Sequence, residues 1–369
     1  MIPLVDLKKQ TRQLEREIQR AIGEVLADCH YVRGKWIEQF EEAFAQYCGG
    51  AYASAVSSGT AALHLALLAA GVGPEDEVVT SPYTFIATAE AITAAGARPV
   101  FVDIQPGPLT IDPEKIDGVV TRRTKSIVPV DLYGQPADLD AIREVARVHG
   151  LTVIEDACQA AGAQYKGRPI GGTSHLTCFS FYPSKTLGAL GDAGAVVTND
   201  LKASEHVRLR RDHGQTEPGV HEVEGYNARM DSIQAAVLLV KLQHVNRWNE
   251  ARRRHAGQYD ELLTDVEGVK IPAVMEYADP VYALYTIRAR HRDRLQAHLH
   301  QRGISTGVYY PIPLHLQVAY RSLGYKEGDF PVAEAAAQET LSLPMYPELS
   351  EGEISHVAES VRAFYQGKP

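Results

Sequence analysis

The sequence is poor in the features that mark secreted, membrane-bound and nucleic-acid-binding proteins. Its four cysteines (Cys29, Cys48, Cys158 and Cys178) have neither disulfide nor metal-site spacing, so we expect a cytoplasmic protein without a bound metal. The start, MIPLVDLKKQ, lacks the apolar core of a signal peptide, and no hydrophobic run is long enough to span a membrane. The net charge of −9 at pH 7 argues against nucleic-acid binding.

What remains is an ordinary globular composition arranged in alternating patterns. The 369 residues are 45% apolar and 22% charged, enough for a full α/β domain and a smaller one. Seven apolar, β-prone runs lie at residues 52–58, 77–82, 98–104, 126–132, 151–157, 176–182 and 194–199. Because helical patterns separate most of them, we expect an α/β fold with a seven-stranded, mainly parallel sheet covered by helices on both faces. A short loop joins the last two runs, which allows these to pair antiparallel.

The sequence pattern changes after the last predicted strand of the sheet. A helical pattern runs from about Ser232 to Leu263, and the stretches VYALYTIRAR (281–290) and STGVYY (305–310) predict strands around a helix at 292–303. This combination is typical of a small α+β domain. We therefore expect a large domain at residues 1–249, which includes an N-terminal arm, and a small C-terminal domain at residues 250–369.

The first predicted strand ends in SSGTAAL, directly before a helical pattern. Backbone N–H groups at Gly59 and Thr60, together with the positive end of the helix dipole, make a phosphate site there. Simple capping of the helix by serine or threonine is the alternative. The stretch has neither the glycine-rich dinucleotide fingerprint nor the lysine of a P-loop.

Three more strand ends carry chemically distinctive side chains. Phe85 follows the second strand, where it could stack on a flat ring or be an ordinary core residue. Asp156 ends the fifth strand, where a carboxylate is costly to bury unless it meets a cation, such as a protonated ring nitrogen, or caps a helix. Lys185 lies in a loop of small residues between the last two strands. Its amine could form a Schiff base with a carbonyl, or remain a solvated surface group.

One ligand makes use of all these positions. Pyridoxal 5'-phosphate has a phosphate that suits Gly59 and Thr60, and a flat ring that suits Phe85. Its ring nitrogen, which must stay protonated to draw electrons from the substrate, suits Asp156. Its aldehyde suits Lys185, which we expect to hold the cofactor and then to move a proton between substrate and cofactor.

The same segments resemble the sequence blocks of pyridoxal-phosphate-dependent nucleotide-sugar aminotransferases of the DegT/StrS type. The blocks are SSGTAAL, SPYTFIATAEAI, ARPVFVDI, LYGQPADLDAI, VIEDACQAAGAQYKG, SFYPSKTLGALGDAGAVVTND and GYNARMDSIQAAVL, in family order along nearly the whole chain. The resemblance implies the fold-type I aminotransferase architecture. It also implies a homodimer with its two active sites at the subunit interface.

Position by position, the resemblance agrees with the roles inferred above and adds others. It assigns the Schiff base to Lys185, the ring nitrogen to Asp156, stacking to Phe85 and the phosphate to Gly59 and Thr60. Three residues gain roles from the resemblance alone, namely Gln159, Ser180 and Asn227. Gln159 falls where the family contacts the cofactor's hydroxyl or ring face, and Ser180 matches a phosphate contact. Asn227 matches a residue that reaches the cofactor phosphate of the neighbouring subunit.

Candidate substrate residues lie in the predicted small domain. The segment TGVYYPIPLHLQVAY carries Tyr309, Tyr310 and His315, whose side chains can hydrogen-bond hydroxyls or pack on sugar and base faces, or can be incidental groups of a packed loop. Its YPIPLHLQ part resembles enzymes that aminate carbon 3, rather than carbon 4, of a keto-sugar. Tyr31, near the N-terminus, is a further candidate contact for the nucleotide or sugar.

We therefore expect an aminotransferase that moves an amino group from an amino acid, L-glutamate, to a nucleotide-linked keto-sugar. The expected acceptor is a dTDP- or UDP-3-keto-sugar aminated at C3 in amino-sugar biosynthesis. The alternatives are the same chemistry at C4 or on a cyclitol ketone, and a regulatory homologue without turnover. The presence of both Lys185 and Asp156 argues against the regulatory reading, and against the family's dehydratases, in which histidine replaces the lysine.

Overall fold

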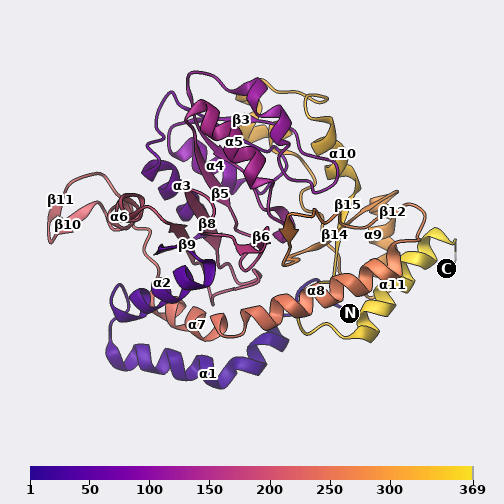
Figure 1. Ribbon diagram of the computed structural model, residues 1–369. Helices are drawn as coiled ribbons and strands as arrows, with labels where there is room; N and C mark the ends of the chain where they lie inside the picture. The colour runs from indigo at the N-terminus through magenta and orange to yellow at the C-terminus, as the bar shows by residue number, and fades with distance from the viewer. Residues whose placement is uncertain (368–369) are drawn as a thin grey trace.

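The computed structural model describes residues 1–367, and a seven-stranded sheet forms its centre (Figure 1). The strands are β1 (Tyr52–Val56), β2 (Glu77–Thr80), β3 (Arg98–Phe101), β4 (Thr124–Val128), β5 (Thr152–Asp156), β8 (Leu176–Ser180) and β9 (Gly194–Thr198), in the spatial order β1-β9-β8-β5-β4-β2-β3. Each predicted run is thus a strand of this sheet. β9 is antiparallel to both of its neighbours, β1 and β8, and the other pairs are parallel.

Helices cover both faces of the sheet, as the continuous apolar strands predict. They are α2 (Lys35–Cys48), α3 (Gly59–Ala69), α4 (Ala87–Ala94), α5 (Leu139–His149), α6 (Leu201–Arg210) and α7 (Ser232–Leu242). Neighbouring residues of a strand point to opposite faces. On β8, Phe179 packs in the core with α2 and α7, whereas Cys178 packs with α3, α4 and α6. On β5, Val153 packs with α5.

One predicted long helix is two helices. α7 ends at Leu242, and α8 (Val245–Leu263) begins three residues later. At the junction the backbone hydrogen bonds join residues three apart, as in a 3₁₀ turn, instead of four apart. They run from the N–H of Gln243 to the carbonyl of Val240 (3.3 Å) and from the N–H of His244 to the carbonyl of Lys241 (3.0 Å). The apolar pattern continues through this turn, so the sequence does not reveal the break. α1 (Leu7–Asp28) packs along α7 (Figure 1).

A second, small sheet lies beside α8, in the C-terminal part of the chain. It consists of β12 (Val269–Lys270), β14 (Tyr285–Ala289) and β15 (Thr340–Leu343) in that order, with α9 (Arg292–Gln301), α10 (Pro331–Glu339) and α11 (Glu351–Tyr365) around it. The prediction of a strand at 305–310 is wrong. Only Gly307 pairs there, with Ser342 of β15. The chain then leaves the sheet, because the carbonyl of Tyr309 accepts the hydroxyl hydrogen of Tyr83 at 2.9 Å.

Short strands and the N-terminal segment complete the fold. β6 (Gln164–Tyr165), β7 (Arg168–Pro169) and β13 (Ala278–Asp279) form a small sheet, and β10 (Gln215–Glu217) and β11 (Val220–His221) form a hairpin that projects beyond α6 (Figure 1). The N-terminal segment lies near the sheet formed by β12, β14 and β15. The N–H of Ile2 donates to the carbonyl of Gly303, and the carbonyl of Leu4 accepts from the N–H of Met345. α8 runs across the predicted division between residues 1–249 and 250–369, which we keep as a proposal.

Two absences hold for the described residues 1–367. No helix there is long and apolar enough to cross a membrane. Nor do their histidine, cysteine, aspartate and glutamate side chains form a group that could hold a metal ion.

Candidate active site

A cavity of about 510 Å³ opens where the loops after β1, β2, β5 and β8 meet the chain around Tyr309. Parallel sheets of this kind bind ligands beyond the carboxyl ends of their strands. The cavity brings together most of the residues singled out in the sequence: Gly59, Thr60, Phe85, Asp156, Gln159, Ser180, Lys185, Tyr309 and Tyr310. Residues far apart along the chain therefore share one site.

The N-terminus of α3 forms one end of this cavity. Ser58 caps the helix, with its Oγ accepting from the N–H of Ala61 at 3.1 Å. The first intrahelical bond runs from Ala62 to the carbonyl of Ser58, so the N–H groups of Gly59 and Thr60 point beyond the helix end. Ser58 therefore caps the helix as expected, and this leaves the two N–H groups available to a ligand, so phosphate binding there stays a prediction.

Gly59 lets the helix end approach β8 very closely. A Cβ atom at this position would lie 2.7 Å from the Cβ of Ser180 and 2.9 Å from the Sγ of Cys158, both too close for any side chain. The Ser180 hydroxyl is therefore next to the first N–H groups of α3, which have no partner within the helix. Two backbone donors, a hydroxyl and the positive helix end make a cradle that fits a phosphate group.

Asp156 is the buried acid of the site, with only 5% of its surface exposed. Its Oδ2 accepts from the hydroxyl of Thr88 at 2.7 Å, and its Oδ1 accepts from the N–H of Cys158 at 3.2 Å. It caps no helix, because the next regular element along the described chain is β6. A buried carboxylate held by two neutral donors is well suited to a cationic partner, such as a protonated ring nitrogen.

Lys185 sits in a tight turn of the β8–β9 loop, where its N–H donates to the carbonyl of Tyr182 at 2.8 Å. Burial lowers the pKa of the Lys185 amine, and the nearby Cys158 and Asp156 oppose this shift in part. A lowered pKa leaves more of the amine unprotonated, which favours its attack on an aldehyde.

The flat part of a ligand has a place beside Phe85. Although it lines the cavity, 55% of the surface of Phe85 is exposed, so the side chain offers a face for stacking.

Gln159 is fixed at both ends of its amide. Its Oε1 accepts from the N–H of Tyr133 at 2.6 Å, and its Nε2 donates to the hydroxyl of Tyr310 at 3.2 Å. Tyr310 is thereby held over the site, and burial raises the pKa of its hydroxyl.

Sequence reasoning missed several residues of this cavity. Thr88 and Cys158 contact Asp156, and Leu4 and Val5 of the N-terminal segment line the cavity wall. Thr88 lies one helical turn after Phe85, which is a local signal that could have pointed to it. Leu4 and Val5 have no such signal, because only the folded chain brings the N-terminus to the site.

Three predicted residues lie outside the cavity of this chain. Asn227 is exposed and forms an isolated bridge with Asp212, close to the base of the β10–β11 hairpin. The ring of Tyr31 is also exposed. His315 is buried, and its Nε2 lies 3.0 Å from an oxygen of Glu334. The binding roles of these three residues stay predictions.

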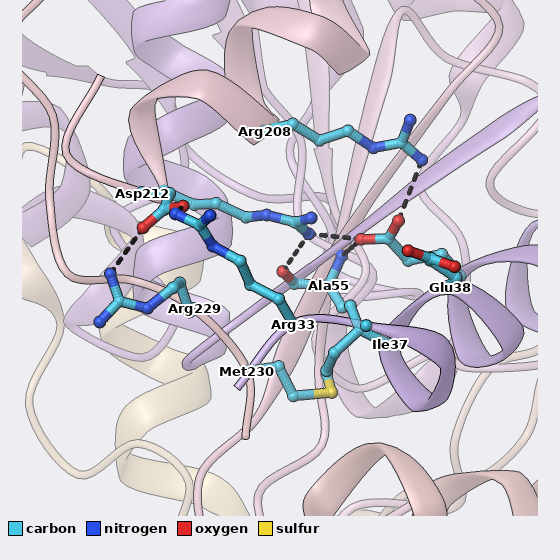
Figure 2. Close-up of a pocket in the computed structure, with 11 residues that line it drawn as sticks. Arg33, Ile37, Glu38, Ala55, Arg208, Asp212, Arg229 and Met230 are labelled. Carbon is cyan, nitrogen blue, oxygen red and sulfur yellow. Dashed lines mark hydrogen bonds and ion pairs between the residues drawn. The ribbon is translucent and has the colours of Figure 1, made fainter. Parts of the chain in front are cut away.

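A second cavity, of about 250 Å³, is lined by four arginines: Arg33, Arg208, Arg211 and Arg229 (Figure 2). Each of these arginines is engaged in an ion pair, although two carboxylates serve all four. Arg33 and Arg229 pair with Asp212, as Figure 2 shows for Arg229. Arg208 and Arg211 pair with the buried carboxylate of Glu41. We therefore assign no ligand to this cavity.

Comparison with known proteins identifies the family. The model of the DegT/DnrJ/EryC1/StrS aminotransferase family matches residues 12–362. The chain belongs to this family. Its members depend on pyridoxal phosphate, and the cradle at Gly59, the acid Asp156 and the amine of Lys185 fit that cofactor. The fold-type I architecture expected from the sequence is confirmed.

Individual relatives cover almost the entire chain. A pleiotropic regulatory protein of Geobacillus stearothermophilus is 48% identical over 99% of both chains. A dTDP-3-amino-3,4,6-trideoxy-alpha-D-glucose transaminase of Streptomyces venezuelae is 44% identical, over 98% of this chain and 95% of the relative. The crystal structure of S. venezuelae DesV in complex with a ketimine intermediate superposes with a TM-score of 0.98 at 43% identity, covering 99% of this chain and 98% of that one.

Proposed function

We propose that this aminotransferase takes the amino group of L-glutamate and passes it to C3 of a dTDP- or UDP-3-keto-sugar in amino-sugar biosynthesis. The observation that carries the proposal is the placement of Lys185, Asp156 and the open end of α3 around one cavity. The three groups match the aldehyde, ring nitrogen and phosphate of a single cofactor. A regulatory protein without turnover would not need a buried acid and a lysine of lowered pKa in the same cavity.

In the proposed site each residue has a distinct task. When bound, pyridoxal phosphate supplies an aldehyde that takes up the amino group and a ring that withdraws electrons. The N–H groups of Gly59 and Thr60 and the hydroxyl of Ser180 bind its phosphate. Asp156 keeps a proton on the ring nitrogen. Lys185 holds the cofactor and then carries a proton between the reacting carbons.

The sugar is expected to enter beside the two tyrosines that close the cavity. Tyr309 and Tyr310 line it together with Phe85, and the ring centroids of Tyr310 and Phe85 lie 6.0 Å apart. Hydroxyl groups on a flat aromatic wall suit a sugar, which has polar edges and apolar faces. Support for C3 comes from the S. venezuelae transaminase, whose name places the amino group on carbon 3 of a dTDP-linked sugar.

We further propose that the protein is a cytoplasmic homodimer whose subunits share their active sites. Asn227 lies outside its own chain's cavity, next to a hairpin that projects from the body (Figure 1). Exposed apolar side chains occur in the same region, among them Val220 and Tyr226. A two-fold interface with shared sites requires an apolar surface for contact. It also requires a polar residue that lies outside its own chain's cavity and can enter that of the partner.

The substrate assignment is tested by half-reactions. The holoprotein is first converted to its aminated form with L-glutamate, and then mixed with dTDP- and UDP-linked 3-keto- and 4-keto-sugars and a cyclitol ketone. We expect a 3-keto-sugar to restore the original absorption band fastest. A faster response to a 4-keto-sugar or a cyclitol would contradict the assignment to C3. A protein that binds the cofactor but responds neither to glutamate nor to any ketone would be a regulatory homologue.

A further inference from the structure

Helix α7 contacts the β8–β9 loop that carries Lys185 through two polar side chains. Gln234 and Lys241 are seven residues apart, so they lie on the same face of α7. The Oε1 of Gln234 accepts from the N–H of Leu190 at 2.9 Å, and its Nε2 donates to the Leu190 carbonyl at 3.3 Å. The Nζ of Lys241 donates to the carbonyl of Gly188 at 2.6 Å.

Lys241 is an unusual residue for this position because it is almost completely buried, with 2% of its surface exposed. Burial lowers the pKa of its amine to about 8, and no acid in the described chain offsets that shift. Burying a lysine costs free energy that a leucine or methionine would not cost. What the lysine provides in return is a donor for the Gly188 carbonyl.

Gly188 belongs to the same tight turn as Lys185. A Cβ atom on Gly188 would lie only 2.3 Å from the carbonyl oxygen of Pro183, so the loop folds back closely on itself. The N–H of Ala189 donates to Phe181 at 2.7 Å and closes the turn at the end of β8. Fixing the Gly188 carbonyl therefore fixes the backbone on both sides of Lys185.

We propose that Lys241 is a positioning residue that holds the Lys185 turn so that the Lys185 amine stays directed into the cofactor cavity. Gln234 steadies the second half of the same loop at Leu190. This inference rests on the proposed role of Lys185 as the residue that holds the cofactor. It adds a side chain that touches neither cofactor nor substrate, since neither Lys241 nor Gln234 lines the cavity.

The test compares three variants of the full-length protein. Lys241→Met keeps the length and apolar stem but removes the donor, whereas Lys241→Gln keeps a neutral donor. Ile233→Ala is the matched control, because Ile233 lies on α7 but packs toward α1. The measurements are amide hydrogen exchange of residues 183–193 without added cofactor, the dissociation constant of pyridoxal phosphate, and the melting temperature.

For Lys241→Met we expect exchange in residues 183–193 to accelerate about tenfold and cofactor affinity to fall about tenfold, the effect of losing one buried hydrogen bond. Lys241→Gln should recover most of both losses. Ile233→Ala should lower the melting temperature while changing both quantities less than twofold. If Lys241→Met does not fold, Gln234→Ala serves instead, with faster exchange at Leu190 and weaker cofactor binding expected.

Two results would overturn the proposal. One is loop exchange in Lys241→Met no faster than in Ile233→Ala. The other is a looser loop with unchanged cofactor affinity, which would make Lys241 a purely structural residue. A different result would show that the proposed role of Lys185 is wrong, namely cofactor attachment that is unaltered in Lys185→Ala. That result would not change the hydrogen exchange of the cofactor-free loop.

Discussion

The hydroxyl of Thr88 donates a 2.7 Å hydrogen bond to Oδ2 of Asp156, while the N–H of Cys158 holds Oδ1 of the same carboxylate. The Thr88 hydroxyl lies in turn 3.0 Å from that of Thr84. The acid is thus fixed from both sides by neutral donors. Its charge remains available for a ligand in the cavity.

This contact predicts a role for Thr88 in orienting the acid. Thr88→Val keeps the shape but removes the hydroxyl, so Asp156 can turn away from the ring nitrogen. We expect kcat to fall about tenfold, the scale of one charge-assisted hydrogen bond, and Thr88→Ser to restore it. Thr93→Val is the control on the same helix, because the Thr93 hydroxyl bonds to backbone carbonyls and to the side chain of Tyr320, not to Asp156. Equal losses in Thr88→Val and Thr93→Val would refute the role.

Asp156 itself is tested by Asp156→Asn. The amide keeps the shape but cannot hold a proton on the ring nitrogen, so the ring withdraws electrons poorly while the cofactor still binds. Steady-state kinetics should show kcat lower by roughly a hundredfold or more, about 3 kcal/mol of barrier. A loss below about threefold would mean that the carboxylate has no part in the chemistry.

Directly beside Asp156, on the opposite face of the sheet, Glu155 forms a buried hydrogen bond with Asp131. Both side chains are fully buried, and burial together with the charge of Glu155 raises the pKa of Asp131 well above its usual value. Glu155 also accepts from the hydroxyls of Ser174 and Thr177. Asp131 is therefore the partner that keeps its proton.

This pair predicts a pH dependence of stability. Above about pH 4 an unfolded Asp131 loses its proton while the folded one retains it, so rising pH lowers the free energy of unfolding. The slope from this group is about 1.4 kcal/mol per pH unit until the folded group ionises too. Asp131→Asn supplies an N–H donor without a titrating proton, and should remove this slope in urea unfolding measured from about pH 5 to about pH 8. An unchanged slope would show that the pair shares no proton.

Mixed dimers test the shared active site. If Asn227 serves the partner's cofactor, a dimer of one Lys185→Ala chain and one Asn227→Ala chain has one intact site and one site with both defects. Random exchange makes about half the dimers mixed, so roughly a quarter of the wild-type activity should return. If Asn227 acts within its own chain, every site keeps one defect. Mixing then gives only the average of the parents, although differently tagged chains show that exchange took place.

The sequence predicted the large sheet well because its strands are buried on both faces and read as continuous apolar runs. It failed where tertiary contacts decide the local structure. Residues 305–310 have the composition of a strand, yet the Tyr309 carbonyl bonds to the hydroxyl of Tyr83, 226 residues away. The break between α7 and α8 interrupts no apolar pattern, so periodicity could not reveal it.

The sequence predicted those residues of the site that lie at the ends of strands. Lys185 and Asp156 stand out because a lysine among small residues and a carboxylate closing an apolar strand both demand an explanation. Thr88 and Lys241 do not stand out, because a threonine or lysine in a helix is ordinary until the fold shows what it contacts. Leu4 reaches the cavity because backbone bonds to distant residues, Ile2 to Gly303 and Met345 to Leu4, hold the N-terminal segment in place.

The central claim is that Lys185 carries the cofactor. The most direct measurement reduces the holoprotein with borohydride, which makes the bond between lysine and cofactor permanent, and locates the added mass by peptide mapping. We predict one modified peptide, containing Lys185, and none in Lys185→Ala. A label on another lysine, such as the buried Lys241 with its pKa of about 8, would contradict the claim, as would cofactor that is bound but attached to no lysine.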